Sequence, residues 1–441
     1  MQPRSRSAEV WQLALPIIGG MTSQNLLNLA DAWMVGGLGA AALAGVGMAN
    51  FINFIAFAAI AGFSPAVQAI AARRVGEGRT SEVAVSLNGG LLLSLLIGVP
   101  LATLLIVAAP WLFAQLNHDP AVVEQGAPYL QWRLVAVAAV GMNFAFRGYW
   151  SAVKLTRYYL MTLVGMHALN LVFSYTLIHG LFGLPAMGTT GAGIGTTLAT
   201  LIGTGAYFWL AARHARPQGF LARRPTGEEF RSLLRLGIPS SVQQLLFASG
   251  FLALFWIIGK VGTAELAVAN VLITLSLTAV LPGMGFGIAA ATLCSQALGR
   301  GDAEDAHRWA WDVFRVSLWV FGAMTLIVLL FPEAILTLFL RDPALVELGR
   351  LPLLLFGASI ALDGLGLIMM QALLGAGASA LVMAVAIGLQ WGLFLPLAWL
   401  LGPVAGFGLT SLWLAMGGYR LLQALIFTRA WQRRDWARLK L

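Results

Sequence analysis

The sequence contains few charged residues and almost no cysteine. Of its 441 residues only 10% are charged, one is a cysteine, and five are histidines. One cysteine cannot form a disulfide within the chain, and Cys and His do not cluster into a metal-binding motif. By contrast, 59% of the residues are hydrophobic, in long stretches that satisfy their backbone as membrane-spanning helices. The alternating ten-residue segments of a membrane β-barrel are missing, and a soluble protein is excluded.

Apolar stretches recur along the whole chain and predict twelve membrane-spanning helices. A segment of about 20 residues is long enough to cross a bilayer. The predicted spans cover residues 10–35, 42–72, 85–110, 122–150, 158–180, 191–213, 236–260, 266–297, 309–332, 346–373, 379–401 and 405–428. The sequence therefore predicts an all-α integral membrane protein.

The second half of the sequence repeats the first at a constant spacing, which we call the repeat offset. Pro16 and Pro239 are as far apart in the sequence as Gly39 and Gly262. Solenoid repeats have periods of only about 20–50 residues, so two transporter halves framing a binding site are the better interpretation. Six spans per half should relate the halves by a pseudo-twofold axis along the membrane normal.

The longest hydrophilic segment divides the chain into its predicted domains. We expect an N-terminal six-helix lobe (1–215), a cytoplasmic linker (216–235) with several prolines, glycines and arginines, and a C-terminal six-helix lobe (236–441). Because both lobes belong to one chain, we expect a monomer. The start of the chain lacks a cleavable signal pattern, so the first span should act as its own insertion signal.

Positive charge marks one side of the membrane and explains the net charge of +9. Arginine and lysine gather at both termini and in alternate loops: Arg4, Arg6, Arg73, Arg74, Arg79, Lys154, Arg157, Arg213, Arg216, Arg223, Arg224, Arg231, Arg235, Arg429, Arg433, Arg434, Arg438 and Lys440. The positive-inside rule then places both termini in the cytoplasm. The charge indicates topology, and we expect no nucleic-acid partner.

Polar side chains inside the spans carry most of the functional information, because they are costly in hydrocarbon. In the first span Gln24, Asn28 and Asp31 lie at positions i, i+4 and i+7, on one helical face. With no Lys or Arg nearby in the sequence, the Asp31 carboxyl should bind a proton or a cation readily. The structural alternative is an interfacial acid that is hydrogen-bonded to a loop.

The fifth span has a similar polar face. His167, Asn170 and Ser174 lie at i, i+3 and i+7. Asn and Ser often join membrane helices by hydrogen bonds, so a ligand role and a packing role for Asn170 remain equally open. For His167, packing is the simpler interpretation.

The second half has an acid of its own at a different place. Asp363 lies near the middle of the tenth span, and its counterpart one repeat offset earlier is Val140. The counterpart of Asp31 is Leu254. The acids should therefore have different tasks, although a structural role for Asp363 is also open.

Other polar and glycine-rich features have several interpretations. Gln243 and Gln244 in the seventh span are candidates for contacting either Asp363 or the substrate. Arg133 in the fourth span should reach the outer surface or pair with an acid. The stretches GAGIGTT and PGMGFGIAAAT lack the lysine of a phosphate loop and favour close packing of helices.

Several stretches together resemble the multidrug and toxic compound extrusion (MATE) family, and within it the DNA-damage-inducible F (DinF)-like branch. They are NLADAWMVGGLGAAALAGVGMAN around Asp31, GYWSAVKLTRYYL after the fourth span, NLVFSYTLIHGLFGLPAMGTTGAGIGTTLAT from Asn170, LGIPSSVQQ in the seventh span, PGMGFGIAAATLCSQALGRGD from Pro282, and ALDGLGLIMMQALLGAGAS around Asp363. The resemblance covers essentially the full length.

The resemblance implies two six-helix lobes around a V-shaped cleft, in the inner membrane of a bacterium. It implies export of cationic amphipathic compounds in exchange for protons or sodium, without a cofactor or a catalytic residue. Asp31 matches the family's coupling acid in the first helix, Asn170 the polar position beside it, and Asp363 the acid of the tenth helix.

Two departures from the family pattern favour protons over sodium. Ser174 replaces an acid that many relatives carry four residues after the asparagine, and Phe247 replaces a glutamate of the seventh helix. Both changes weaken a sodium site, because hard cations prefer several oxygen ligands that include carboxylates. Proton coupling needs one carboxyl group, so we predict proton antiport, with sodium coupling as the alternative.

Other function classes are less consistent with the sequence. A lipid-linked precursor flippase with a similar two-lobe plan needs a basic cleft for pyrophosphate, whereas Arg133 is the only deep cation that we count. An intramembrane enzyme would need a nucleophile with its base, or a metal site, and neither motif is found. A receptor without transport predicts that Asp31→Asn changes stability alone.

Overall fold

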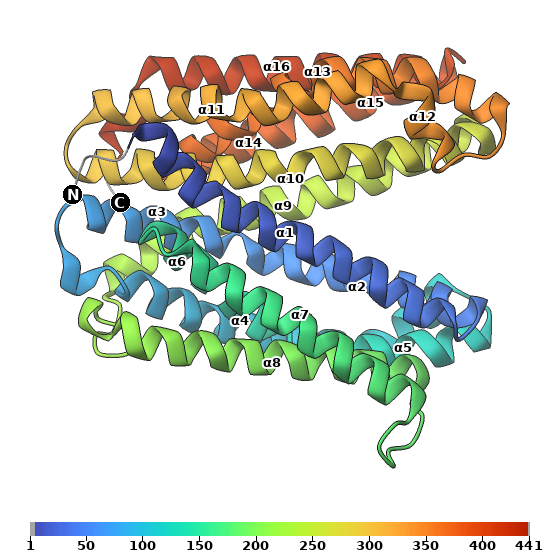
Figure 1. Cartoon of the computed structure of the whole chain (residues 1–441), viewed down its shortest axis with the longest axis horizontal. Coiled ribbons are helices and arrows are strands. Elements are labelled where there is room, and N and C mark those ends of the chain that lie inside the picture. The colour runs from blue at the N-terminus through green and yellow to red at the C-terminus, as the bar shows by residue number, and fades with distance from the viewer. Residues whose placement is uncertain (1–4, 440–441) are drawn as a thin grey trace. The chain divides into compact units, whose positions relative to one another are not determined.

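The computed structural model describes residues 5–439, and within this range the regular elements are all helices. Figure 1 shows the chain as long helices joined by short connections. Arg4 and Lys440, which contributed to the charge pattern, lie outside the described residues.

The helices of the first half follow the predicted spans closely. They are α1 (Arg6–Gly36), α2 (Ala40–Ala61), α3 (Phe63–Gly76), α4 (Val85–Leu116), α5 (Pro120–Val135), α6 (Val137–Ala152), α7 (Thr156–His179) and α8 (Gly188–His214). The pairs α2 with α3 and α5 with α6 each form one predicted span, interrupted at Gly62 and Ala136.

In the second half, the spans equivalent to these two interrupted pairs are single continuous helices. Its helices are α9 (Gly227–Val261), α10 (Thr263–Gly299), α11 (Ala303–Leu330), α12 (Pro332–Thr337), α13 (Pro343–Gly375), α14 (Ser379–Leu389), α15 (Leu395–Trp399) and α16 (Gly408–Arg433). Helices α14 and α15 are joined by a π-helical turn, and a second such turn follows α15.

Every predicted span coincides with helical structure. Within residues 5–439, nine helical stretches are long and apolar enough to cross a membrane. The other three predicted spans correspond to α1, to α5 with α6, and to α16. The all-α prediction of twelve spans is therefore confirmed.

The sequence repeat is also a repeat of the backbone. Three pairs of helices begin one repeat offset apart, namely α2 and α10, α5 and α13, and α7 and α14. Asp119 and Asp342, separated by the same offset, cap α5 and α13 by accepting hydrogen bonds from backbone N–H groups at 3.0 and 2.9 Å. A proline at the first position of each helix completes the same start signal.

The chain packs as two compact units that exchange the beginnings of two helices. One unit contains residues 19–241, and the other contains residues 5–18 together with 242–439. The exchange points at Ile18 and Ser241 are also one repeat offset apart. Each unit has its own hydrophobic core. Val10, Leu13 and Ala14 of α1 belong to the core of the unit that contains residues 242–439. The lobes predicted from the sequence, 1–215 and 236–441, remain a prediction.

Ion pairs anchor the beginnings of both exchanged helices. At the start of α1, Arg6 donates to Asp305 and to Asp312, each at 2.6 Å, and its guanidinium lies 3.7 Å from the Trp309 ring centre. At the equivalent position of α9, Glu229 pairs with Arg74 of α3. The exchange is thus supported by charge as well as by apolar burial.

A buried asparagine side chain binds the segment between the two repeats. Asn88 of α4 donates to the carbonyl oxygens of Gly219 and Arg223 at 2.9 and 2.8 Å. Its own amide oxygen accepts from the backbone N–H of Leu221 at 3.1 Å. The Asn88 side chain therefore makes three hydrogen bonds that hold the connection against the unit of residues 19–241.

Candidate functional site

A polar stripe on α1 forms the first part of the candidate site, as the spacing predicted. The Gln24 amide donates to the Asn28 side-chain oxygen at 3.1 Å, one helical turn away. Asp31 follows on the same face and is half-buried, whereas Gln24 and Asn28 are exposed. The Asp31 carboxylate makes no direct hydrogen bond or ion pair with the described residues. Its charge is therefore available for a proton or a cation.

His167 joins this stripe to α7. The residue is 7% exposed, and its Nε2 lies 3.1 Å from the Gln24 side-chain oxygen. Its Nδ1 lies 3.0 Å from the Ser23 hydroxyl oxygen, and the carbonyl oxygen of Gly20 lies 2.8 Å from the same hydroxyl. Both ring nitrogens thus contact α1. His167 positions the polar face of α1, a specific contact where the sequence suggested packing alone.

Asn170 and Ser174 form a separate buried pair further along α7. The Ser174 hydroxyl donates to the Asn170 side-chain oxygen at 3.3 Å. Gly195 of α8 permits this arrangement, because a Cβ atom added there would lie 2.6 Å from the backbone nitrogen of Ser174. Among the described residues, neither side chain of this pair forms a hydrogen bond with Asp31. Close helix packing was the predicted role of the GAGIG stretch, and it is confirmed here.

Arg133 lies on the α5 side of the same unit and supplies positive charge near Asp31. In the amide orientation that satisfies both groups, the Asn53 oxygen accepts from Nε of Arg133 at 2.9 Å. The guanidinium interacts electrostatically with the Asp31 carboxylate. Arg133 also lies 5.9 Å from the Tyr129 ring centre. An arginine held by Asn53 therefore balances the acid without a direct ion pair.

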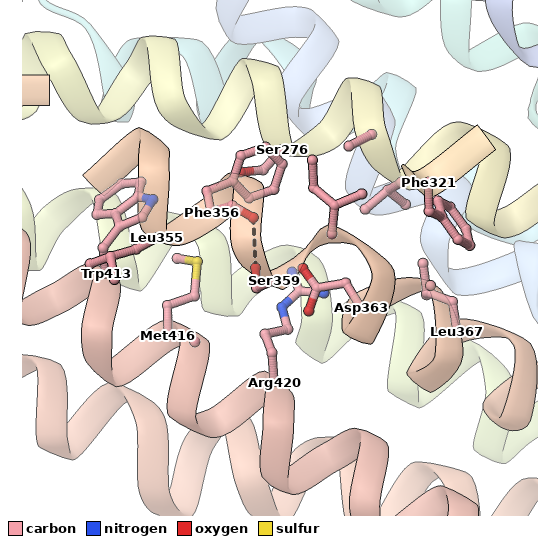
Figure 2. A pocket seen from close by; sticks show the side chains of 15 residues that line it. Ser276, Phe321, Leu355, Phe356, Ser359, Asp363, Leu367, Trp413, Met416 and Arg420 are labelled. Atoms are coloured by element: carbon pink, nitrogen blue, oxygen red, sulfur yellow. Dashed lines mark hydrogen bonds between the residues drawn. The ribbon is translucent and has the colours of Figure 1, made fainter. Parts of the chain in front are cut away.

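A second candidate site lies in the unit that contains the second half. Asp363 of α13 and Arg420 of α16 line one pocket, and Figure 2 shows their charged ends pointing toward each other. The two side chains interact electrostatically. Gln243, a predicted neighbour of Asp363, instead donates to the Met370 sulfur at 3.7 Å. Gln244, the next residue of α9, is half-buried.

Arg420 is a cation inside a predicted span that the sequence analysis did not count. It lies within the predicted span 405–428, so Arg133 is not the only cation inside the spans. A single arginine in a long apolar stretch barely changes the average hydropathy, which is why the pattern did not single it out. Its charge alone was the available signal, because a charged residue inside a span usually has a partner.

No metal centre is recognised among the described residues. No group of three or more His, Cys, Asp or Glu side chains within residues 5–439 is arranged to hold a metal ion. The one cysteine, Cys294, is buried and donates to the carbonyl oxygen of Ala306 at 3.3 Å.

Comparison with protein families explains the sequence repeat. A family model described as MatE matches residues 16–176 and again residues 239–400. The chain belongs to the MatE family. The two matches begin at Pro16 and Pro239, the same pair that marks the sequence repeat.

Curated relatives of this MatE chain are similar over nearly its whole length. The probable multidrug resistance protein NorM of Rhodopseudomonas palustris is 30% identical over 97% of this chain and 92% of its own length. The protein of the same name from Bradyrhizobium diazoefficiens is 29% identical over 92% of this chain and 89% of its own length. Assignment to the DinF-like branch remains a prediction, because these relatives carry the NorM name.

Solved structures show the same fold. A MOP superfamily transporter from Pyrococcus furiosus, whose reversed pocket polarity is described as suggesting a different function, has a TM-score of 0.89 at 20% identity, with 99% of this chain and 98% of that chain covered. A multidrug resistance MATE transporter in an outward-facing conformation has a TM-score of 0.87 at 22% identity, with 98% and 96% covered. The predicted MATE architecture is confirmed by these likenesses.

The two sites of this MatE protein have different chemical capacities. Near Asp31, the side-chain amides and the imidazole bond to one another, and the carboxylate makes no direct hydrogen bond or ion pair with the described residues. Near Asp363, a guanidinium of the same chain supplies the opposite charge. Arg133 is held by Asn53, whereas Arg420 lines the same pocket as Asp363 and its Nε has no hydrogen-bond partner among the described residues.

Proposed function

We propose that this MatE protein is a secondary active antiporter that exports cationic amphipathic compounds in exchange for protons, and that Asp31 carries the exchanged proton. The observation that carries the proposal is the Asp31 carboxylate, which lies inside a span without a direct ion pair. An ionisable residue at such a place is a functional-site candidate by default. The names of the NorM relatives support drugs as the exported compounds.

The surroundings of Asp31 favour a proton over sodium. Hard cations are best held by several oxygen ligands that include carboxylates. Here the Asn28 oxygen accepts from Gln24, and the Asn170 oxygen accepts from Ser174. The nearby Arg133 charge also repels a metal cation. A proton needs only the carboxylate itself.

Exchange follows if the proton and the substrate favour different conformations. Asp31 takes a proton from the outer side, the unit containing it rearranges, and the substrate leaves outward. After the protein turns inward, Asp31 releases the proton to the cytoplasm and a new substrate binds. The proton and the substrate need not share ligands, because each only has to shift the same conformational equilibrium.

The membrane potential requires such exchange for a cationic substrate. Moving one positive charge out against an interior-negative potential costs about 2.3 kcal/mol per 100 mV, and one inward proton offsets that amount. Each unit of pH difference then adds roughly 1.4 kcal/mol. One proton therefore sustains about a tenfold gradient of a monovalent substrate per pH unit.

The remaining predicted residues take supporting roles in this proposal. Gln24 and Asn28 present polar groups beside Asp31, and Asn170 with Ser174 fixes the packing of α7. Gln243 and Gln244 are the substrate candidates of the second half. We also propose that the protein acts as a monomer among the lipids of a bacterial inner membrane, with both termini in the cytoplasm.

Transport in everted membrane vesicles tests the proposal. Uptake of ethidium would be measured with an imposed proton gradient, and separately with an imposed sodium gradient, for the unmodified protein and for Asp31→Asn. Asp119→Asn is a matched control, because it removes an exposed carboxylate and keeps a capping side chain. We expect proton-driven uptake that Asp31→Asn abolishes and Asp119→Asn retains. Equal proton-driven uptake by all three proteins would contradict the proposal.

Arg420 is a second cation inside the predicted spans and could favour the alternative function, a lipid-linked precursor flippase. A pyrophosphate group would require a surplus of positive charge in the cleft. Arg420, however, faces Asp363, so the pair adds no net charge to its pocket. The flippase therefore gains no support from this arginine.

A further inference from the structure

The charge pair in the second half has no role in the proposed proton exchange. Asp363 lies on α13 and Arg420 on α16, and these two helices pack against each other. Figure 2 shows the side chains of Asp363 and Arg420 pointing into the same pocket. Besides this pair, the Tyr419 hydroxyl is the titratable group that interacts with both charges.

Parts of both charged groups have no hydrogen-bond partner among the described residues. These are Oδ1 of Asp363 and Nε of Arg420, both buried, and the indole nitrogen of Trp413 in the same pocket is also without one. The pocket has a volume of about 30 Å³. That volume is large enough for a water molecule.

The rest of the pocket is largely apolar, and this determines how much the pair matters. Phe321, Phe356 and Leu367 are among its lining residues. A carboxylate alone in such surroundings would need either a proton or a compensating cation. In this chain the guanidinium of Arg420 provides that positive charge from within the protein.

We propose that Arg420 is a specificity-determining residue: a built-in cation that balances Asp363 and so keeps the second half from binding sodium. The inference rests on the proposed antiport function, in which Asp31 binds the exchanged proton. It assigns one exchanging carboxylate, Asp31, to the protein, although both Asp31 and Asp363 were candidates from the sequence.

Sodium binding to the purified full-length protein tests this inference without transport. Melting temperatures at pH 8 would be compared in sodium chloride and in choline chloride at equal ionic strength. The unmodified protein should melt at the same temperature in both salts. Arg420→Gln should gain about 3 °C or more in sodium, because a ligand of the folded state raises the melting temperature.

Two further variants serve as matched controls. Arg420→Gln combined with Asp363→Asn has no charge to compensate, so its melting temperature should not depend on sodium. Arg420→Lys keeps the positive charge and should behave like the unmodified protein. The inference is overturned if the unmodified protein gains a sodium response that Asp363→Asn removes, or if folded Arg420→Gln has none.

Failure of Arg420→Gln to fold is also informative. Recovery of folding in the double variant would support the inference, because Asp363 is then the charge that needs a partner. Equal loss of folding in both variants would overturn it, because Arg420 would then act through something else. The vesicle experiment with Asp31→Asn fails or succeeds independently, so the two proposals can be distinguished.

Discussion

The contact between the first and fifth spans of each half exists in two chemical versions. In the first half, His167 of α7 lies 3.1 Å from the side-chain oxygen of Gln24 on α1. At the equivalent positions of the second half, Gln390 donates to the main-chain oxygen of Phe247 on α9 at 3.3 Å. The two helices are in contact in both halves, but only the first half places a polar side chain on both of them.

The acids also differ between the halves, because each has an apolar residue at the equivalent position of the other half. Asp31 has Leu254 as its counterpart, which is 2% exposed in an apolar core. Asp363 has Val140 as its counterpart. Turns, caps and apolar faces therefore build the same scaffold twice, and a few polar substitutions give each copy its own chemistry. If this comparison is correct, variants at equivalent positions should have unequal effects.

The largest expected difference concerns the two acids. Asp31→Asn should abolish proton-driven ethidium transport, because Asp31 is the group that carries the exchanged proton in this proposal. The double variant Asp363→Asn with Arg420→Gln should retain most of that transport, because it removes a neutral pair. Vesicle uptake at matched protein abundance measures both. Loss of transport in the double variant alone would reverse our assignment of the two halves.

The next effect concerns stability within the charge pair. Arg420→Gln or Asp363→Asn alone should destabilise the protein by about 3 kcal/mol, because each leaves an uncompensated charge in an apolar pocket. The double variant should recover much of the loss. Thermal unfolding of purified protein in choline chloride measures all three. Simple additivity of the two single effects would show that the side chains do not act as a pair.

A smaller effect separates two glycines at equivalent positions. A Cβ atom at Gly195 would lie 2.6 Å from the Ser174 backbone nitrogen, whereas one at Gly418, its counterpart in the second half, would have no atom within 4 Å. Gly195→Ala should therefore cost about 1–3 kcal/mol through overpacking. Gly418→Ala should be neutral or stabilise by about 0.5–1 kcal/mol. Equal melting temperatures for the two variants would contradict this account of the α7–α8 contact.

The smallest expected effect concerns the histidine contact. His167→Leu removes both side-chain contacts to α1 and should cost about 1–2 kcal/mol. His167→Gln can keep the hydrogen bond to Gln24 and should lose less. Thermal unfolding gives the stabilities, and vesicle uptake shows whether the position of α1 affects exchange. A leucine variant as active and stable as the glutamine variant would leave His167 with a packing role alone.

The sequence contained most of the fold because helix signals are local. Apolar stretches of spanning length located the twelve spans, and the constant offset revealed the repeat. The same locality predicted that Gln24, Asn28 and Asp31 share a helical face, and the hydrogen bond from Gln24 to Asn28 bears this out. The exchange of helix starts at Ile18 and Ser241 left no such signal, because it depends on packing between distant segments.

Contacts between distant helices were beyond the sequence pattern. The partners of His167 lie far away in the sequence, on α1, and their meeting depends on how each helix is rotated. Asn53, which binds Arg133, was hidden for the same reason. Arg420 was overlooked because long apolar neighbours mask one charge. Its role became visible only when the structure placed it beside Asp363.

Proton release during substrate binding tests the central claim most directly. Ethidium would be added to purified protein in weakly buffered solution containing a pH indicator, with Asp31→Asn as the comparison. Because substrate and proton compete for one conformational equilibrium, the unmodified protein should release up to about one proton per ethidium bound, and Asp31→Asn should release none. Ethidium binding by the unmodified protein without proton release would contradict coupling through Asp31.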